Sequence, residues 1–425
     1  MPRRKRVLSG MRPTGRLHIG HYFGALDNWI KLQNDPAYEC FFFVADWHAL
    51  TTDYADTSQI AQNTIEIGID WLAAGLDPAK CTLFVQSQVP EHAELHLLLS
   101  MITPLGWLER VPTYKEQMEQ MQDKDLDTHG FLGYPLLQTA DIVMYGDPSA
   151  GLSVPVGEDQ VPHIEMAREV VRKFNYHFGF TLNRRLFLLG NEDAFLEVQR
   201  IVPNPEYPSR IHPGLSAEAL WEMNIRWKIE QEGVRNFFHK LEKARLFMIL
   251  KSVLAEPDAQ LTPTPRILGA DGRKMSKSYR NALLLGEDEN SIRMKIRGMV
   301  TDPARRMRTD KGNPDVCPVF SWHRLFSGQD TIARVNKECR TAEIGCVDCK
   351  GLMADALVGW IEPMRARRQE YETHPARVLE ILDEGSKKAR KVAQETMGRV
   401  REAVFGWKEK REELAQGAKP AARRD

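Results

Sequence analysis

The chain of 425 residues carries 58 Lys and Arg residues and 58 Asp and Glu residues, so its formal net charge at pH 7 is zero. This balance excludes a polybasic coat protein of nucleic acids, although a local basic patch can still bind a nucleic acid. A hydrophobic content of 42% is ordinary for a globular protein, and the length predicts two or three domains. The N-terminus, MPRRKRVLSGM, lacks the apolar run of a secretory signal, and no stretch resembles a membrane span. We therefore expect a cytoplasmic enzyme with no membrane partner.

Short apolar runs alternate with helical stretches between residues 6 and 180. Strands are predicted at Val7 and Leu8, over 40–45 (CFFFVA) and over 82–85 (TLFV), and helices over 22–32 and 60–74. Strands separated by helices indicate a parallel sheet covered on both faces, with ligands bound at the carboxyl ends of the strands. We predict an α/β protein whose Rossmann-like, doubly wound catalytic domain comprises residues 1–180 and 263–290.

The rest of the chain is predicted to be mainly helical. A proline-rich stretch at 202–214 is followed by a candidate helix cap at Ser216 and by helical periodicity to about Leu254, interrupted near Gly233. We interpret 181–262 as a helical insertion. Residues 291–415 are rich in Lys and Arg and are expected to form a helical domain, followed by a flexible tail at 416–425.

A glycine-rich segment, SGMRPTGRLHIGH at residues 9–21, follows the first predicted strand. Its glycines let the backbone approach a ligand, and the amides of the helix that it opens point toward the same place. His18 and His21, one turn apart, can donate hydrogen bonds to phosphate oxygens. A solvent-facing turn is the more frequent interpretation of such a pair when it occurs by itself.

A second segment, GADGRKMSKS at residues 269–278, places Lys274 and Lys277 in a loop. Mobile cations of this kind suit the charge that develops on phosphates during transfer, although a solvated basic loop has the same composition. The occurrence of HIGH early in an α/β domain and KMSKS late in it resembles the two signatures of class I aminoacyl-tRNA synthetases.

Four further segments narrow this resemblance: FVADWHALT at 43–51, FVQS at 84–87, QTADI at 138–142 and VPVGEDQ at 154–160. They are similar to bacterial tryptophanyl-tRNA synthetases over most of 6–180 and 263–412. The resemblance implies a homodimer that activates L-tryptophan with ATP and Mg²⁺ and transfers it to tRNA(Trp). It also implies that 291–415 binds the tRNA anticodon. The role of the insertion at 181–262 stays open: it could cover the acceptor stem of the tRNA, extend a dimer contact or contribute only bulk.

The resemblance also implies residue roles. Asp141 corresponds to the acceptor of the indole N–H, while Tyr134, Gln160 and His48 belong to the tryptophan site. A carboxylate in an apolar pocket is costly unless paired, which suits recognition of an N–H donor, whereas Asp141 could instead cap a helix ahead of Ile142. The catalytic residues implied are His18, His21, Lys274 and Lys277. The implied ATP contacts are Arg12, Pro13, Thr14, Gly20, His21, Gly157, Glu158, Asp159, Ile267, Lys274, Met275, Ser276, Lys277 and Ser278. Gln138 departs from the family, in which many members carry Met, so the pocket wall is expected to be more polar.

Four cysteines, Cys317, Cys339, Cys346 and Cys349, have the spacing C-x21-C-x6-C-x2-C. Four thiolates can hold zinc or a [4Fe–4S] cluster, and unrelated buried thiols are the remaining alternative. Spacing does not choose the metal. The resemblance favours [4Fe–4S], which a subset of the family carries on a spacing one residue longer, and zinc stays the alternative.

Two other functions remain open. A tyrosyl-tRNA synthetase has the same signatures, and a non-catalytic, synthetase-like module is a weaker alternative because such proteins usually lose a signature residue. The residues around His92 are interpreted as a helix start, and the histidines outside the motifs receive no role. Basic residues number 12 against 6 acidic ones at 266–311, and 6 against 1 at 386–401. These tracts predict salt-sensitive tRNA binding.

Overall fold

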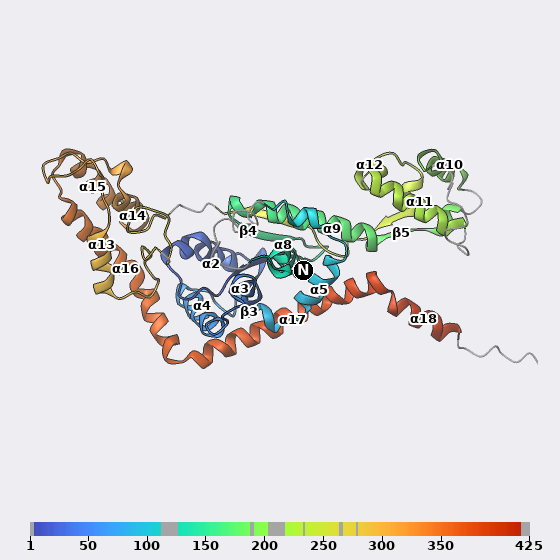
Figure 1. Cartoon of the computed structure of the whole chain (residues 1–425), viewed down its shortest axis with the longest axis horizontal. Helices are drawn as coiled ribbons and strands as arrows, with labels where there is room; N and C mark the ends of the chain where they lie inside the picture. Colours follow the sequence, from blue (N-terminus) through green and yellow to red (C-terminus); the bar gives the residue numbers. More distant parts are fainter. Residues whose placement is uncertain are drawn as a thin grey trace, which may run out of the picture.

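A computed structural model describes residues 4–111, 126–187, 191–202, 217–232, 234–262, 267–277 and 279–417. The chain is elongated, with the parallel sheet and its helices in the centre (Figure 1). The insertion lies at one end of the molecule, and the helices from α13 (Glu289–Gly298) to α16 (Cys346–Thr373) lie at the other. The long helix α17 (Pro375–Phe405) runs back beneath the sheet, so the C-terminal region touches the centre as well as one end.

The central sheet has the order β3-β2-β1-β4-β7, and every neighbouring pair is parallel. This arrangement confirms the predicted Rossmann-like α/β fold. The chain leaves β1 toward β2 and β3 and later returns to place β4 on the other side of β1. The carboxyl ends of β1 and β4 therefore flank the switch point at which such sheets bind ligands. The strands are β1 (Lys5–Met11), β2 (Tyr38–Val44), β3 (Cys81–Val85), β4 (Leu152–Val156) and β7 (Pro257–Leu261).

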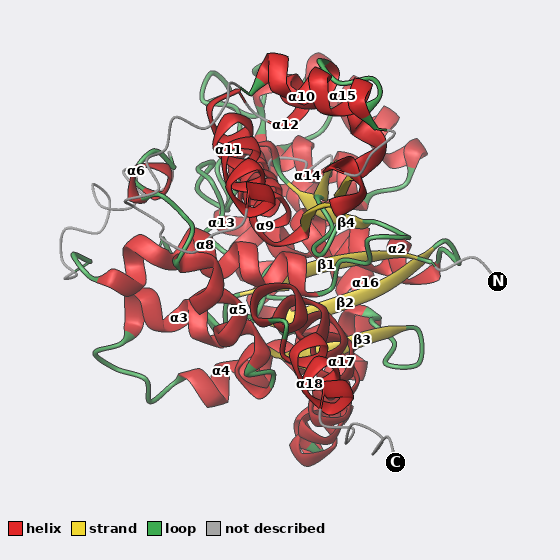
Figure 2. Cartoon of the chain, turned by 90° about the vertical axis from the view of Figure 1, so that its right-hand side faces the viewer, coloured by secondary structure: helices red, strands yellow, loops and turns green. Residues whose placement is uncertain are grey.

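Helices cover both faces of this sheet (Figure 2), as expected for strands that are apolar on both sides. The helix predicted over 22–32 begins as a π-helical turn, Tyr22–Leu26, directly after the HIGH motif. The helix predicted over 60–74 is confirmed. The helices of the domain are α1 (Ile19–His21), α2 (Asp27–Asn34), α3 (Asp46–Asp53), α4 (Ile60–Ala74), α5 (Glu91–Ser100), α6 (Leu105–Leu108), α8 (His129–Met144) and α9 (Val161–Gly179).

The insertion has its own small core, which includes Val198, Ile225 and Phe237. The prediction of a helix to Leu254 was wrong beyond His239, because residues 248–250 form a strand that pairs with β5 instead. The predicted cap at Ser216 and the break at Gly233 lie outside the described residues. The insertion was expected to end at residue 262. It ends earlier in the structure, because β7 (Pro257–Leu261) belongs to the central sheet. The elements are β5 (Phe180–Leu182), α10 (Glu192–Ile201), α11 (Ala217–Glu232), α12 (Val234–His239) and β6 (Met248–Leu250).

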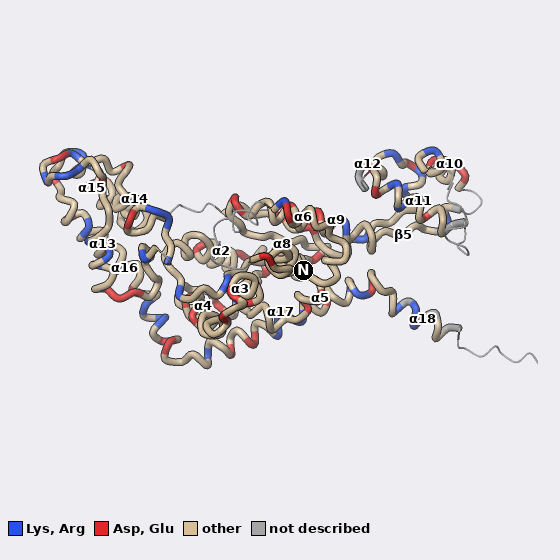
Figure 3. Tube along the Cα trace, in the orientation of Figure 1, with Lys and Arg blue, Asp and Glu red and all other residues tan. Residues whose placement is uncertain are grey.

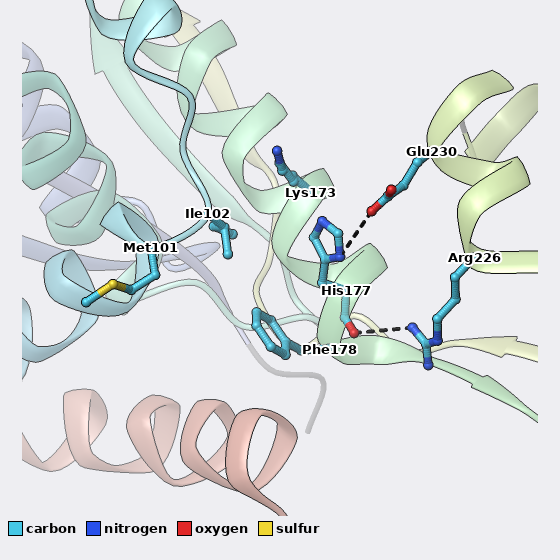
Figure 4. Close-up of a pocket in the computed structure, with 7 residues that line it drawn as sticks. All are labelled: Met101, Ile102, Lys173, His177, Phe178, Arg226 and Glu230. Atoms are coloured by element: carbon cyan, nitrogen blue, oxygen red, sulfur yellow. Dashed lines mark hydrogen bonds and ion pairs between the residues drawn. The ribbon is translucent and has the colours of Figure 1, made fainter. Parts of the chain in front are cut away.

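Helix α11 of the insertion is held against the end of α9 (Figure 4). His177 Nδ1 lies 3.7 Å from Glu230 Oε1, and Arg226 donates to the His177 carbonyl at 3.3 Å. The same guanidinium lies 4.9 Å from the centre of the Phe180 ring. His177, Arg226 and Glu230 line a cavity of about 560 Å³ between the insertion and the end of α5. The insertion is thus attached through side chains as well as through its two strands.

The C-terminal region is helical, as predicted. Its helix α17 covers the outer edge of β3, where Ser386 Oγ accepts the Val85 N–H at 3.2 Å. Gly385 permits this approach, because a Cβ there would lie 1.7 Å from the Leu83 carbonyl oxygen. None of the described helices has the length and apolar character needed to span a membrane. The helices are α13 (Glu289–Gly298), α14 (Pro318–Phe326), α15 (Gln329–Thr341), α16 (Cys346–Thr373), α17 (Pro375–Phe405) and α18 (Trp407–Gly417).

Candidate active site

The motifs found in the sequence meet at the carboxyl edge of the central sheet. HIGH follows β1, His48 follows β2, residues 157–160 follow β4, and the KMSKS segment follows β7. Parallel strands end at the same edge, so segments far apart in the chain converge there without any special local structure.

The HIGH motif forms a tight turn in which the His18 ring packs closely over Gly20. A Cβ on Gly20 would lie 2.8 Å from His18 Cε1. The two imidazole centroids are 3.8 Å apart, and the His18 backbone N–H donates to Nδ1 of His21 at 3.2 Å. Nδ1 of His21 is therefore an acceptor, which leaves the proton on Nε2.

Both imidazoles of this motif are neutral at pH 7. Burial, and then the charge of Lys277, lower the pKa of His18 to about 4. Burial lowers the pKa of His21 to about 3, with contributions from His18 and then Lys277. The pair can thus donate hydrogen bonds to a phosphate but does not supply a permanent positive charge.

The KMSKS segment lies directly against the HIGH segment. Lys277 Nζ donates to the Thr14 carbonyl at 2.7 Å, and burial lowers the pKa of this ammonium group. Met275 is buried, and a Cβ on Gly20 would lie 3.8 Å from its sulfur. Lys274 is exposed, whereas Ser278 lies outside the described residues. One lysine of the motif is therefore docked and the other reaches into solvent.

Two further side chains, which no sequence motif indicated, form hydrogen bonds to the KMSKS loop. Asn281 Nδ2 donates to Asp271 Oδ1 at 2.7 Å and to the Lys274 carbonyl at 3.1 Å, and its Oδ1 accepts the Ser276 N–H at 2.8 Å. Trp322 Nε1 donates to the Leu268 carbonyl at 3.0 Å. The only sequence signal for Asn281 is its place three residues after the motif. The backbone of Lys274 is thus fixed while its side chain stays exposed.

Asp141 is buried within helix α8 and is surrounded by three polar side chains. His48 Nε2 lies 2.8 Å from Oδ2, Gln86 Nε2 donates to both oxygens at 2.8 Å, and His92 Nδ1 lies 2.6 Å from Oδ1. Burial raises the pKa of Asp141, but the hydrogen bonds from His48 and His92 outweigh it and hold the pKa at about 2. The carboxylate is therefore ionised at neutral pH.

One alternative for these residues was wrong, since Asp141 is not a helix cap: α8 begins at His129. The helix start predicted around His92 is confirmed, because α5 begins at Glu91. His92 also contacts Asp141 through Nδ1 and the Tyr145 hydroxyl through Nε2 at 2.8 Å. Gln86 carries a sequence signal only as part of the segment FVQS. Nothing in the spacing of the sequence signals that these residues meet.

The other predicted ligand contacts lie around the same edge. The Tyr134 hydroxyl is 3.3 Å from His163 Nε2, and the Arg12 guanidinium contacts the hydroxyl of Thr52. Gln160 Nε2 donates to Asp159 Oδ2 at 2.9 Å near the surface. The structure places Pro13 and Ile267 in buried positions and Glu158 in an exposed one. A Cβ on Gly157 would lie 2.7 Å from Asp159 Oδ1.

The four predicted metal-binding cysteines converge beside a small core of Phe320, Val335 and Ile344. Cys317 precedes α14, Cys339 lies in α15, and Cys346 and Cys349 lie in the first turn of α16. Arg305 Nη1 lies 3.6 Å from Cys339 Sγ. Burial and then the other three thiols raise the pKa of Cys349 to about 12. In the described part of the chain, no three His, Cys, Asp or Glu side chains are arranged to hold a metal ion.

Comparison with known proteins identifies the family. The family model described as "tRNA synthetases class I (W and Y)" matches residues 2–193 and 235–360. The chain is 49% identical to the tryptophan–tRNA ligase of Ralstonia nicotianae over 406 residues, which cover 94% of this chain and 98% of the relative. The chain belongs to the tryptophanyl-tRNA synthetase family of class I. A tyrosyl-tRNA synthetase is the less supported alternative, since the curated relatives are tryptophan–tRNA ligases.

Two further members of the tryptophanyl family show the same extent of similarity. The tryptophan–tRNA ligase of Thermotoga maritima is 41% identical over 400 residues, which cover 94% of this chain and 98% of that relative. The crystal structure of the Campylobacter jejuni tryptophanyl-tRNA synthetase, complexed with ADP and tryptophan, superposes with a TM-score of 0.68 at 26% identity. The match covers 94% of this chain and 99% of that one. The similarity therefore spans the sheet domain, the insertion and the C-terminal helices.

Proposed function

We propose that the chain is a tryptophan–tRNA ligase that activates L-tryptophan with ATP and Mg²⁺ and transfers it to tRNA(Trp). Family membership supports the reaction. The observation that carries the choice of amino acid is the ionised, buried carboxylate of Asp141 at the carboxyl edge of the sheet. Such a carboxylate needs a hydrogen-bond donor, which either the indole N–H or a tyrosine hydroxyl supplies, and the similarity to tryptophan–tRNA ligases favours the indole.

In the proposed reaction, the carboxylate of tryptophan attacks the α-phosphorus of ATP, pyrophosphate leaves, and the adenylate is passed to the terminal ribose of the tRNA. No side chain acts as a covalent nucleophile. The neutral His18 and His21 donate hydrogen bonds to the phosphates, while Lys274 and Lys277 offset the charge that develops on pyrophosphate. Lys277 is docked on the HIGH segment through the Thr14 carbonyl, and Lys274 is exposed in the same loop. Both positions support a role for the lysines next to the phosphates that the histidines would bind.

For tryptophan, Asp141 is proposed to accept the indole N–H. Its oxygens already contact His48, Gln86 and His92, so the substrate must replace one of these contacts. Gln86 and His92 are 0% exposed, whereas the His48 side chain is 12% exposed. His48 is therefore the partner that moves aside most easily. Tyr134 and Gln160 are proposed for the amino-acid head group.

The remaining residues implied by the resemblance are proposed to bind ATP. Those in the segment after β1 and those in the segment after β4 flank the switch point of the sheet, which supports the assignment. They are Arg12, Pro13, Thr14, Gly20, His21, Gly157, Glu158, Asp159, Ile267, Lys274, Met275, Ser276, Lys277 and Ser278.

Pyrophosphate exchange into ATP, measured with each of the proteinogenic amino acids in turn, tests this function. We expect exchange with tryptophan, and with tyrosine a rate lower by at least about a hundredfold, because a pocket built to satisfy one polar group rejects others strongly. Preferential exchange with tyrosine would support a tyrosyl-tRNA synthetase. The absence of exchange with every amino acid would support a non-catalytic module.

The C-terminal helices are proposed to bind the tRNA anticodon, and the enzyme is proposed to act as a cytoplasmic homodimer. Lys and Arg residues recur along α17 and α18 (Figure 3), which agrees with the basic tract at 386–401. Helices α16 and α17 also pack against α4 and β3 of the catalytic domain, so the proposed anticodon-binding region at 291–415 is joined to that domain along both helices. Binding of tRNA is expected to weaken steeply with salt.

The four cysteines are proposed to bind a [4Fe–4S] cluster, with structural zinc as the alternative. Their convergence from three helices beside one core supports a shared centre, and thiolates are the ligands that both metals prefer. Arg305 beside Cys339 offsets negative charge on the thiolates. Among the described residues no three of these side chains are placed to hold a metal ion, so metal binding requires the thiols to rearrange. The centre is assigned no step in the reaction.

Purification without oxygen distinguishes these metals. We expect a brown protein with broad absorbance near ~400 nm and about four iron atoms per chain. Cys339→Ser should lose both the colour and the iron, whereas Cys40→Ser, at a buried cysteine outside the group, should retain them. A colourless protein with one zinc per chain would establish the alternative, and a protein without either metal would contradict the proposal.

A further inference from the structure

A buried ion pair connects the C-terminal helix α16 to the HIGH motif. Arg368 of α16 is 2% exposed and forms ion pairs with Asp70 of α4, with Glu66 one turn earlier and, at 2.8 Å, with Glu372. Asp70 is 1% exposed. Its second oxygen accepts the backbone N–H of Leu17 at 2.5 Å. Leu17 immediately precedes His18, so one carboxylate joins the guanidinium of α16 to the start of the motif.

The Leu17 amide has to be satisfied by this carboxylate. Leu17 is 1% exposed, and a buried N–H without an acceptor is costly enough to shift the backbone. The Leu17 carbonyl accepts the Leu285 N–H at 3.0 Å. Two residues later, the Ile19 N–H donates to the Leu283 carbonyl at 2.9 Å. The turn that holds the two imidazoles is therefore fixed at its entry by Asp70 and along its edge by residues 283–285.

Asp70 in turn depends on Arg368. A carboxylate removed from water is destabilised as an anion unless a cation lies beside it. The guanidinium is the nearest such partner, and the Arg16 side chain contributes a weaker attraction. Because 298 residues separate Asp70 from Arg368, only the packing of α16 against α4 brings them together.

The same C-terminal helices also contact the residues that follow the motif. Tyr22 and Phe23, in the π-helical turn after His21, lie 4.9 and 5.6 Å, centroid to centroid, from Trp360 of α16. Phe326 of α14 lies 5.6 Å from Phe23. The HIGH turn is thus supported by α16 on its N-terminal side through Arg368 and on its C-terminal side through Trp360.

We propose that Asp70 is a positioning residue for the HIGH motif, and that Arg368 holds it, so that α16 forms part of the scaffold of the activation site. The proposal rests on the proposed function. It explains why a buried arginine from a region expected to bind tRNA faces helix α4 of the catalytic domain rather than solvent. Helix α16 also begins at the cysteine centre, roughly 33 Å from Arg368 at 1.5 Å per residue.

Two double variants separate positioning from folding. Asp70→Asn with Arg368→Met removes both buried charges and keeps an oxygen that can accept the Leu17 N–H. Asp70→Leu with Arg368→Met removes the same charges and the acceptor. Tryptophan-dependent pyrophosphate exchange gives kcat and KM for each substrate, and thermal unfolding reports the fold. Arg365→Met, on the same helix and paired only with Glu362 in the described contacts, is the matched control.

We expect the Asn/Met enzyme to keep kcat within about threefold of the wild type, and the Leu/Met enzyme to lose at least about tenfold, since small displacements at reacting groups have large effects on rate. KM for tryptophan should stay within about twofold in both, because Asp70 does not touch that pocket. Equal kcat values for the two folded double variants, or a loss confined to KM for tryptophan, would overturn the proposal. If the wild type shows no exchange, the proposed function fails rather than this inference.

A second measurement decides the matter if the Leu/Met enzyme does not fold. Arg368→Lys keeps the positive charge but cannot bridge three carboxylates with a planar group. We expect the Leu17 amide of this folded variant to exchange its hydrogen at least about tenfold faster than in the wild type, with the amides of α9 unchanged. Unchanged exchange at Leu17 would contradict the role assigned to the pair.

Discussion

Lys274→Ala is expected to lower the rate of tryptophan activation at least about a hundredfold, with a smaller effect on the affinity for tryptophan. Removing one group that stabilises charge in a transition state typically costs on the order of 3 to 4 kcal/mol. Lys274 is exposed, and Asn281 fixes its carbonyl, so the substitution removes the cation without disturbing the loop. Pre-steady-state formation of the adenylate, measured with saturating ATP and tryptophan, gives the rate directly.

Arg273→Ala is the matched control for this experiment. Arg273 is the neighbouring cation in the same loop, but its guanidinium pairs with Asp271 at 2.7 Å and lies 4.6 Å from the centre of the Tyr279 ring. Its charge is therefore engaged locally, and the rate is expected to stay within about threefold of the wild type, as for most exposed ion pairs. Equal turnover by Lys274→Ala and the wild type would refute the role assigned to Lys274. A similar loss in both variants would show that the general charge of the loop, rather than Lys274, is responsible.

Asp141→Asn is expected to lower kcat/KM for tryptophan at least about a hundredfold, because the site loses a charged acceptor and gains a donor among groups that also donate. The new amide group would face Gln86 Nε2, which donates to both carboxylate oxygens in the wild type. The loss should appear mainly in KM for tryptophan, while KM for ATP changes little. Exchange kinetics with tryptophan and with tyrosine provide both values and the specificity ratio.

Asp147→Asn serves as the control for Asp141. Asp147 is also buried, at 5% exposure, and its Oδ1 accepts the Ser149 N–H at 2.8 Å in the turn before β4. The same chemical change there should leave KM for tryptophan within about twofold, because its hydrogen bonds with Ser149 lie within a turn outside the group around Asp141. If Asp141→Asn leaves the tryptophan kinetics unchanged, the proposed recognition of the indole N–H is excluded.

Much of the fold could be predicted from the sequence because its signals are local. The apolar run at 40–45 and the helical period at 60–74 correspond to β2 and α4, since each pattern lies within one element. HIGH and KMSKS are also contiguous, so they could be found and ordered before any contact was known. The failures lie where one pattern fits several structures: Phe237, Ala244 and Met248 share a core, but they reach it from an α-helix, a 3-10 helix and a strand.

The surroundings of the site residues could not be predicted in the same way. His92 and Asp141 are 49 residues apart, and Asp70 and Arg368 are 298 apart, with no recurring spacing to connect them. Their contacts depend on which strands are neighbours and on where the C-terminal helices pack. The sequence contains the groups that carry the chemistry: two imidazoles, two lysines, one aspartate and four thiols. Only the packed chain sets their protonation and orientation, because burial and partners from distant elements make His18 and His21 neutral and keep Asp141 ionised.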